Sequence, residues 1–153
     1  MNLREMSQTR LRAWLAAGIW TAAGIGFAVT FFTGGGPGGF PEDSGRHLAG
    51  AVALAFGFFG YWLVLWLTRR RKGAPPMADE RDLHITARAN QATLMVVLVA
   101  VFAFTIGLWT THEAQGQVPV GWMWFLAYGC VILASVTSAV TILILDGRTG
   151  GHG

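Results

Sequence analysis

Long apolar stretches alternate with short polar ones along this chain. A helix needs roughly 20 residues, at about 1.5 Å each, to cross the hydrocarbon core of a bilayer. Four stretches reach that length and carry almost no charge, and they cover residues 11–32, 47–68, 91–111 and 121–145. The pattern therefore predicts an all-α integral membrane protein, a single transmembrane domain with four spans.

The longest polar stretch lies between the second and third spans and reads RRRKGAPPMADERDLHITARAN, residues 69–90. Four cations end the second span, and two prolines then interrupt any helix. We expect this cytoplasmic linker to join two transmembrane hairpins. Its second half, residues 77–90, has a helix-compatible composition. We expect it to lie on the membrane surface or to extend the third helix, with Asp79 as its N-cap and Asp82 three positions on.

The remaining polar segments are short. Residues 34–45, GGGPGGFPEDSG, are rich in glycine and proline and predict an irregular loop, after which Asp43 or Ser44 is expected to cap the second span. Residues 112–118 predict a short polar loop. We expect the tail, residues 147–153, to be flexible and without regular structure.

Composition supports a membrane protein. Hydrophobic residues make up 53% of the chain and charged residues 12%, about half the share that is usual in soluble proteins. The net charge of +3 alone would be compatible with nucleic-acid binding. The cations flank the apolar spans, however, where they anchor to lipid headgroups. We therefore expect membrane lipid, and no nucleic acid, as a partner.

The distribution of cations predicts the orientation. Lys and Arg accumulate in short cytoplasmic loops. If both termini and the linker are cytoplasmic, only Arg46 of the 11 cations lies outside, and the inside set is Arg4, Arg10, Arg12, Arg69, Arg70, Arg71, Lys72, Arg81, Arg88 and Arg148. Abundant Ala, Gly and Arg with a single Lys suggest a GC-rich bacterial genome, and hence the bacterial inner membrane.

Small residues and tryptophans indicate where the spans meet other surfaces. Ala22 and Gly26, and likewise Ala53 and Gly57, are four residues apart, a spacing that lets helix backbones approach closely. We expect both pairs to take part in helix–helix interaction. Indoles favour the membrane–water interface, and we expect six of them there: Trp14, Trp62, Trp66, Trp109, Trp122 and Trp124.

Cofactor binding remains open on the sequence. His47 starts the second span and His112 follows the third, so both are expected near the outer face, where together they would ligate haem or a metal. We favour the alternative, a pair of solvated interfacial histidines, because a haem site with two histidine ligands normally buries them within the spans and these two lie at the rim. The aromatic residues between 56 and 66 would suit stacking with a quinone or a chlorophyll-type pigment, but lipid packing is the account that we favour. The sequence does not identify a cofactor.

Catalysis and ion-coupled transport find less support. No ionisable residue lies deep inside the spans, whereas proton relays and ion-coupled transporters need such residues. Cys130 has no histidine or carboxylate near it in sequence, so no nucleophilic triad is evident. Four hydroxyl residues in the last span would suit a passive pathway or simple helix packing: Ser135, Thr137, Ser138 and Thr141. We therefore do not expect an enzyme.

The run from Asp79 to Asp82, with Ile85 and Ala89 after it, is similar to a motif in a known family. At this point the chain resembles an uncharacterised family of small four-span prokaryotic membrane proteins that carry Asp-Glu-Arg before the third span. The resemblance implies the four-helix layout and no particular activity. A docking or conformational role for Asp79, Glu80, Arg81 and Asp82 is one hypothesis, and a solvated helix start is the other.

Three functions follow from these observations. The leading hypothesis is a non-catalytic accessory or scaffolding subunit of a larger membrane complex, or a homo-oligomer, because the spans offer packable faces and the external loops are small. The second is a cofactor-binding membrane protein, and the third is a small transporter or channel.

Overall fold

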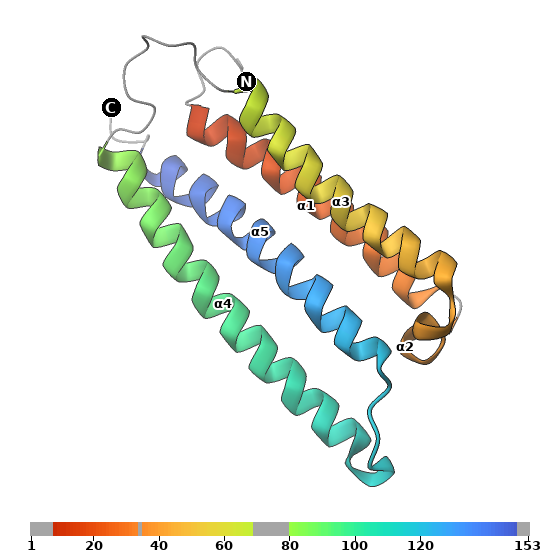
Figure 1. Ribbon diagram of the computed structural model, residues 1–153. Coiled ribbons are helices and arrows are strands. Elements are labelled where there is room, and N and C mark those ends of the chain that lie inside the picture. The colour runs from red at the N-terminus through yellow and green to blue at the C-terminus, as the bar shows by residue number, and fades with distance from the viewer. Residues whose placement is uncertain (1–7, 34, 69–79, 150–153) are drawn as a thin grey trace.

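Four long helices make up almost all of the structure. The computed structural model describes residues 8–33, 35–68 and 80–149. The helices are α1 (Gln8–Phe32), α3 (Ser44–Leu67), α4 (Glu80–His112) and α5 (Gly121–Thr149), as Figure 1 shows. Each is long and apolar enough to cross a membrane. The prediction of an all-α protein with four spans is therefore confirmed. The predicted cap Asp79 and the cations Arg69–Lys72 lie outside the described residues.

Residues 80–90 follow one of the two alternatives predicted for them, because α4 begins at Glu80 and these residues extend the third helix. The boundary predicted near the end of the chain is wrong. The tail was expected to be irregular from residue 147, but α5 continues to Thr149. Asp146 lies within ion-pair distance of Arg10 and Arg81. These contacts hold the last turns of α5 against two other helices, which offsets the weak helix propensity of Gly147.

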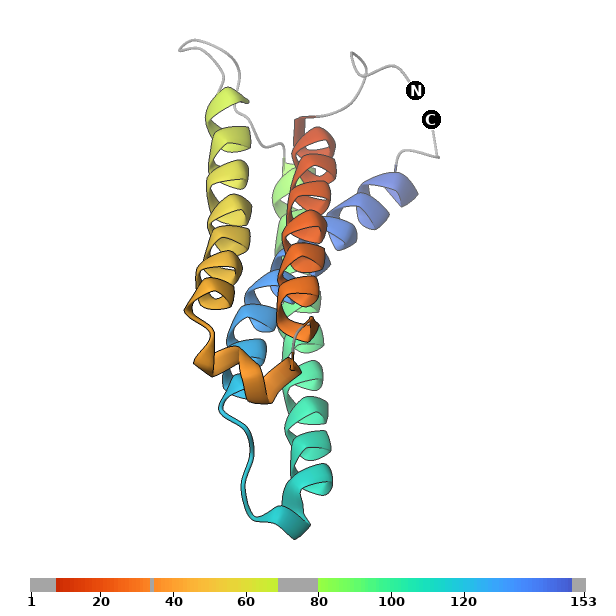
Figure 2. The same cartoon turned by 90° about the vertical axis from the view of Figure 1, so that its right-hand side faces the viewer.

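The helices pack in the order α3–α1–α5–α4. The pairs α1–α3 and α4–α5 are the two predicted hairpins, and α1 and α5 join them. Within the described residues α3 and α4 have no extended contact, so the bundle is not closed on that side. In Figure 2 the start of α1, the end of α3, the start of α4 and the end of α5 lie at the same end of the bundle. We name this end, which carries Arg10, Arg12, Arg81, Arg88 and Arg148, the cation-rich end.

Large side chains of α1 meet small residues of α3. A methyl group added at Gly57 would lie 2.6 Å from the ring of Trp20, and one added at Gly60 would lie 3.1 Å from Ile19. A methyl group at Gly26 would be 3.9 Å from the Cβ of Ala53. Small residues here let the two backbones approach closely. Ala22, in contrast, is exposed and lies off this seam.

The loop between α1 and α3 is more ordered than its composition suggested. It contains the short helix α2 (Gly36–Gly39) and the 3₁₀ turn η1 (Phe40–Glu42), so the expectation of an irregular loop is wrong for residues 36–42. Gly35 and Gly36 turn the chain with φ values of 112° and 58°, which favour glycine. The turn carries Phe40 back into the bundle, where it is only 1% exposed.

Phe40 completes an aromatic cluster at this end of the bundle. It lies 6.3 Å from Phe27 and 5.1 Å from Phe31, measured between ring centroids. Phe27 in turn stacks on Tyr128 of α5 at 4.8 Å. After the turn, the Asp43 carboxylate accepts hydrogen bonds from the backbone N–H groups of Gly45 and Arg46, at 2.9 and 3.3 Å. Asp43 is therefore the N-cap of α3, one of the two residues expected there.

The connection between α4 and α5 is also partly helical. The 3₁₀ turn η2 (Glu113–Gln115) follows α4 directly, and Gly116 ends it with a φ of 63°. Within the loop predicted for residues 112–118, residue 112 is thus the last residue of α4, and residues 113–115 form a 3₁₀ turn. Figure 2 shows α4 and η2 continuing past the ends of α1 and α3.

Candidate functional site

A cavity of about 600 Å³ lies between the two hairpins, near the cation-rich end. All four long helices line it. We name it the inter-hairpin cavity, and its walls include Thr9, Arg12, Ala16 and Trp20 of α1, Phe58, Tyr61 and Leu65 of α3, Asp82 and Thr86 of α4, and Ala134, Ser135, Ser138 and Ile142 of α5. Its volume falls in the range of about 300–1,000 Å³ that is usual for small-molecule sites.

The cavity is polar where it meets the cation-rich end. The Thr9 hydroxyl donates a hydrogen bond to an Asp82 carboxylate oxygen at 3.2 Å. The Arg12 guanidinium donates to the Thr68 hydroxyl at 2.7 Å and to the Thr68 carbonyl at 2.9 Å. Because Thr68 ends α3, where carbonyl groups lack helical partners, Arg12 neutralises the negative end of that helix. Three helix ends are thereby tied together around the cavity mouth.

The deeper part of the cavity is apolar with scattered hydroxyls. Trp20 meets Phe58 edge to face at 5.1 Å, and both rings line the cavity. Ser135 donates to the Val131 carbonyl of its own helix at 2.8 Å. The hydroxyls of Tyr61 and Ser138 form no hydrogen bond with another described residue. A hydroxyl at membrane depth gains free energy from a partner, so this wall suits an occupant that offers one.

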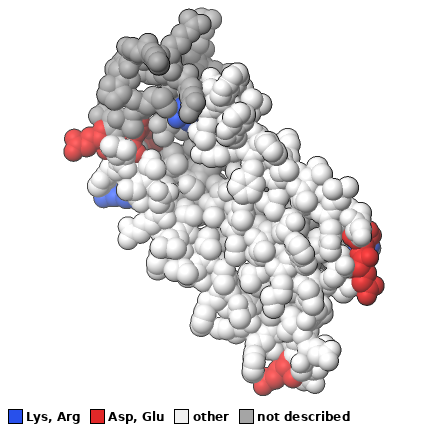
Figure 3. Space-filling model, in the orientation of Figure 1, with Lys and Arg blue, Asp and Glu red and all other residues white. Residues whose placement is uncertain are grey.

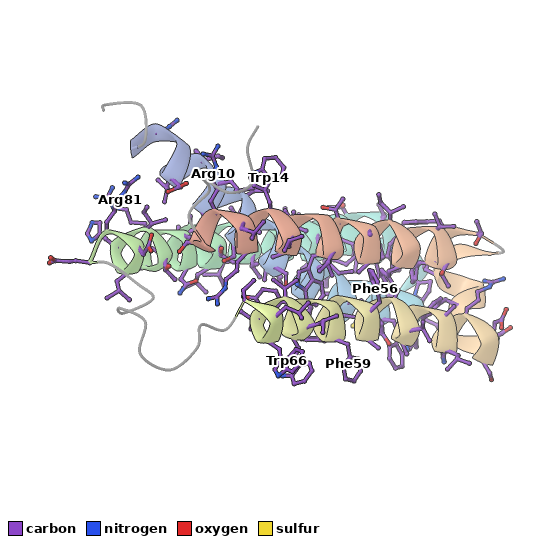
Figure 4. The ribbon with its side chains drawn as sticks, turned by 90° about the horizontal axis from the view of Figure 1, so that it is seen from above. Arg10, Trp14, Phe56, Phe59, Trp66 and Arg81 are labelled. Atoms are coloured by element: carbon purple, nitrogen blue, oxygen red, sulfur yellow. The ribbon has the colours of Figure 1, made fainter. Side chains whose placement is uncertain are left out.

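The Asp-Glu-Arg run begins α4 beside this cavity. Asp82 faces the cavity, whereas Arg81 lies 3.6 Å from Asp146 of α5. Asp146 also lies 3.9 Å from Arg10 of α1, and its side chain is only 14% exposed. Figure 4 shows Arg10 and Arg81 on either side of the end of α5. The motif residues that the structure describes thus join helix ends, while Asp79 lies outside the described part of the chain.

The two candidate haem ligands contact different groups. The His47 ring lies 4.9 Å from Phe40 and 5.2 Å from Trp124. In His112, Nδ1 lies 3.1 Å from the Leu108 carbonyl oxygen and 2.8 Å from the Thr111 hydroxyl. The structure does not bring the two imidazoles into contact within its described residues. Haem or metal ligation by this pair remains a prediction, and no group of three or more metal-ligating side chains occurs among the described residues.

The six tryptophans expected at the interface fall into two groups. Trp14, Trp62, Trp66, Trp109 and Trp124 are exposed on the surface of the bundle. Figure 4 shows Trp66 pointing away from the bundle, as Phe59 does on the same helix. Trp122 is half-buried and packs against Phe31 and Phe125. Charged side chains gather at the ends of the face seen in Figure 3, which leaves an uncharged surface between them.

Sequence reasoning missed one residue of the cavity wall and two residues that hold the bundle together around it. Trp20 lines the cavity and is 3% exposed. Phe40 is buried at the opposite end of the bundle, and Asp146 lies near arginines of two other helices. Trp20 had a usable signal. It falls in a series at spacings of three and four whose members are all buried: Ala13, Ala16, Trp20, Ala23, Phe27 and Phe31.

The comparison with known proteins agrees with this architecture. A model of the family described as "Predicted membrane protein (DUF2178)" matches residues 11–145, which include all four spans and the Asp-Glu-Arg run. The chain belongs to this family of predicted membrane proteins, and with its four apolar helices it is a multi-pass membrane protein. No curated protein and no solved structure matches it significantly.

Proposed function

We propose that the protein is a non-catalytic accessory or scaffolding subunit of a larger membrane complex, and that it holds a transmembrane helix of its partner along the open side between α3 and α4. The observation that carries the proposal is the unclosed bundle. The inter-hairpin cavity lies between hairpins whose outer helices, α3 and α4, have no extended contact within the described residues, and its wall carries the hydroxyls of Tyr61 and Ser138.

Lipid alone is a poor occupant of such a wall. Acyl chains offer no hydrogen-bonding groups, whereas a helix with a serine, threonine or asparagine would bond to both hydroxyls. Interhelical hydrogen bonds of this kind contribute on the order of 1 kcal/mol each in membranes. The small residue Ala134 of α5, which is half-buried at this wall, would let the partner backbone approach closely.

The proposed setting is the bacterial inner membrane with the cation-rich end in the cytoplasm. The arginines at that end support this orientation through the positive-inside rule. The described helix ends that carry these arginines lie at the same end of the bundle. A single membrane–water interface would therefore hold five of them, Arg10, Arg12, Arg81, Arg88 and Arg148.

Photocrosslinking in intact membranes tests the partner helix. A benzoylphenylalanine in place of Tyr61, which lines the cavity and is 37% exposed, should give one discrete adduct with a second polypeptide. The same substitution at Phe59, which is 72% exposed and points away from the bundle, is the matched control and should give lipid adducts. Absence of a polypeptide adduct at position 61, or equal adducts at both positions, would contradict the proposal.

A second candidate is an amphipathic small molecule, such as a quinone, in the same cavity. The gradient from Arg12 and Asp82 at the mouth to Trp20 and Phe58 inside favours a ligand with a polar head and an apolar body. An absorbance band or an extractable compound that copurifies with the wild-type chain would favour this candidate over the subunit.

A further inference from the structure

We infer that a groove at the cation-rich end binds the anionic phosphate headgroup of a membrane lipid. The groove lies between the start of α4 and the end of α5, on a part of α4 that does not line the inter-hairpin cavity, and it encloses about 680 Å³. It is lined by Glu80, Arg81, His84, Ile85 and Arg88 of α4 and by Leu145 and Arg148 of α5. The inference does not depend on the proposed function.

The charge of the groove favours an anion. Three arginines face one carboxylate, so the lining carries a net charge of +2 with His84 neutral. Arg81 is held near Asp146, which fixes one side of the groove. Arg88 and Arg148 come from different helices, are exposed, and form no ion pair with another described residue. Guanidinium groups match phosphate oxygens through paired hydrogen bonds, so these two arginines are suited to grip a phosphate.

The apolar part of the groove favours a lipid over a free anion. Ile85 is only 6% exposed and forms the floor together with Leu145. Below this level neither helix carries a charged residue, and both are apolar enough on average to cross the hydrocarbon region. A phospholipid bound with its phosphate on Arg88 and Arg148 would place its glycerol and first methylene groups against Ile85 and Leu145. Basic pockets between transmembrane helices are a known setting for such headgroups.

The test is a lipid titration of the full chain in an uncharged detergent, read by native mass spectrometry. Phosphatidylglycerol, with an anionic headgroup, should bind more tightly than zwitterionic phosphatidylcholine of the same chain length. The double variant Arg88→Gln/Arg148→Gln should bind phosphatidylglycerol roughly 30-fold more weakly, since each arginine near an anionic lipid contributes on the order of a fivefold change. Arg46→Gln removes one cation at the opposite end and should leave binding unchanged.

Two further arms separate the explanations. Arg88→Lys/Arg148→Lys keeps the charge and should retain most of the binding, which also guards against a folding defect in the glutamine variant. Inorganic phosphate added at millimolar concentration should fail to displace the lipid. Displacement by phosphate would overturn the headgroup assignment in favour of a free-phosphate site. Equal binding of the two lipids, or an equal loss in Arg46→Gln, would overturn the site itself.

Discussion

At the scale of single residues, contacts between large and small side chains decide how α1 and α3 meet. Gly57 has no space for a side chain because the Trp20 ring occupies it, whereas Gly107 on α4 has nothing within 4 Å. Both residues lie inside long helices, so their helix propensities are alike and their surroundings differ. Substituting Gly57 and Gly107 in parallel therefore separates the effect of packing from the effect of backbone flexibility on stability.

Gly57→Ala should destabilise the protein, because the new methyl group would collide with Trp20 and force α1 and α3 apart. Overpacking of this kind costs about 1–3 kcal/mol. Gly107→Ala should leave the stability unchanged or raise it slightly, since alanine is the better helix former. Thermal unfolding in one detergent measures both. An equal effect of the two substitutions would contradict the close α1–α3 seam.

Phe40→Ala should be strongly destabilising for a different reason. Its ring fills the aromatic cluster with Phe27 and Phe31, and truncating a buried phenylalanine costs about 3–5 kcal/mol. Phe59→Ala, at an exposed position on α3, is the control and should cost much less. The same unfolding experiment compares them, and similar losses would show that residues 36–42 do not fold back into the bundle.

At the scale of elements, the ends of the helices are joined by polar contacts at the cation-rich end. Arg12 contacts the end of α3, Thr9 contacts the start of α4, and Asp146 lies between Arg10 and Arg81. These contacts involve residues from distant parts of the sequence. Thr9 and Arg10 thereby join the start of α1 to the start of α4 and to the end of α5.

Asp146→Asn should loosen this end without disturbing the rest of the bundle. Removing the charge leaves Arg10 and Arg81 without their shared carboxylate, which should cost about 1–2 kcal/mol, more than an exposed pair and less than a fully buried one. Hydrogen exchange should speed up in the last turns of α5 and the first turns of α4 and remain unchanged around Phe40. Uniform acceleration, or none, would argue against a local role.

Hydropathy was sufficient to predict the number and approximate position of the spans, because an uninterrupted apolar run has few alternatives to a membrane helix. It was insufficient for the end of α5, and it left open whether residues 80–90 lie on the membrane surface or extend the third helix. The contact of Arg81 with Asp146, two residues more than 60 positions apart, holds the start of α4 against the end of α5. The inter-hairpin cavity could not be predicted from the sequence either, because its walls come from four helices. No local sequence pattern indicates that Tyr61 and Ser138 line the same cavity.

At the scale of the whole molecule, the asymmetry of charge predicts the orientation. Glu80 starts α4 at the cation-rich end, and Gln115 lies in η2 at the opposite end. In a background with Cys130→Ala, which removes the single native cysteine, a cysteine at each position reports its side of the membrane. A membrane-impermeant maleimide should label Gln115→Cys in intact cells and Glu80→Cys only after permeabilisation. The reverse pattern would place the cation-rich end outside.

The unclosed bundle also predicts that the molecule has a partner, and filling the cavity tests this. Ala134 lines the cavity, whereas Ala127 on the same helix is exposed and lies outside the lining. A tryptophan at position 134 should occupy the space between the hairpins and exclude the partner helix. A tryptophan at position 127 changes the same residue type at a lipid-facing position, so it controls for the effects of the substitution itself.

The most direct measurement is the native mass of the particle extracted in a mild detergent, with its absorbance recorded in the same run. The account predicts a wild-type particle well above the 16.5 kDa of one chain, containing a second polypeptide, that is preserved in Ala127→Trp and reduced to the lone chain in Ala134→Trp. A lone, colourless wild-type chain, or a complex that survives Ala134→Trp intact, would contradict it.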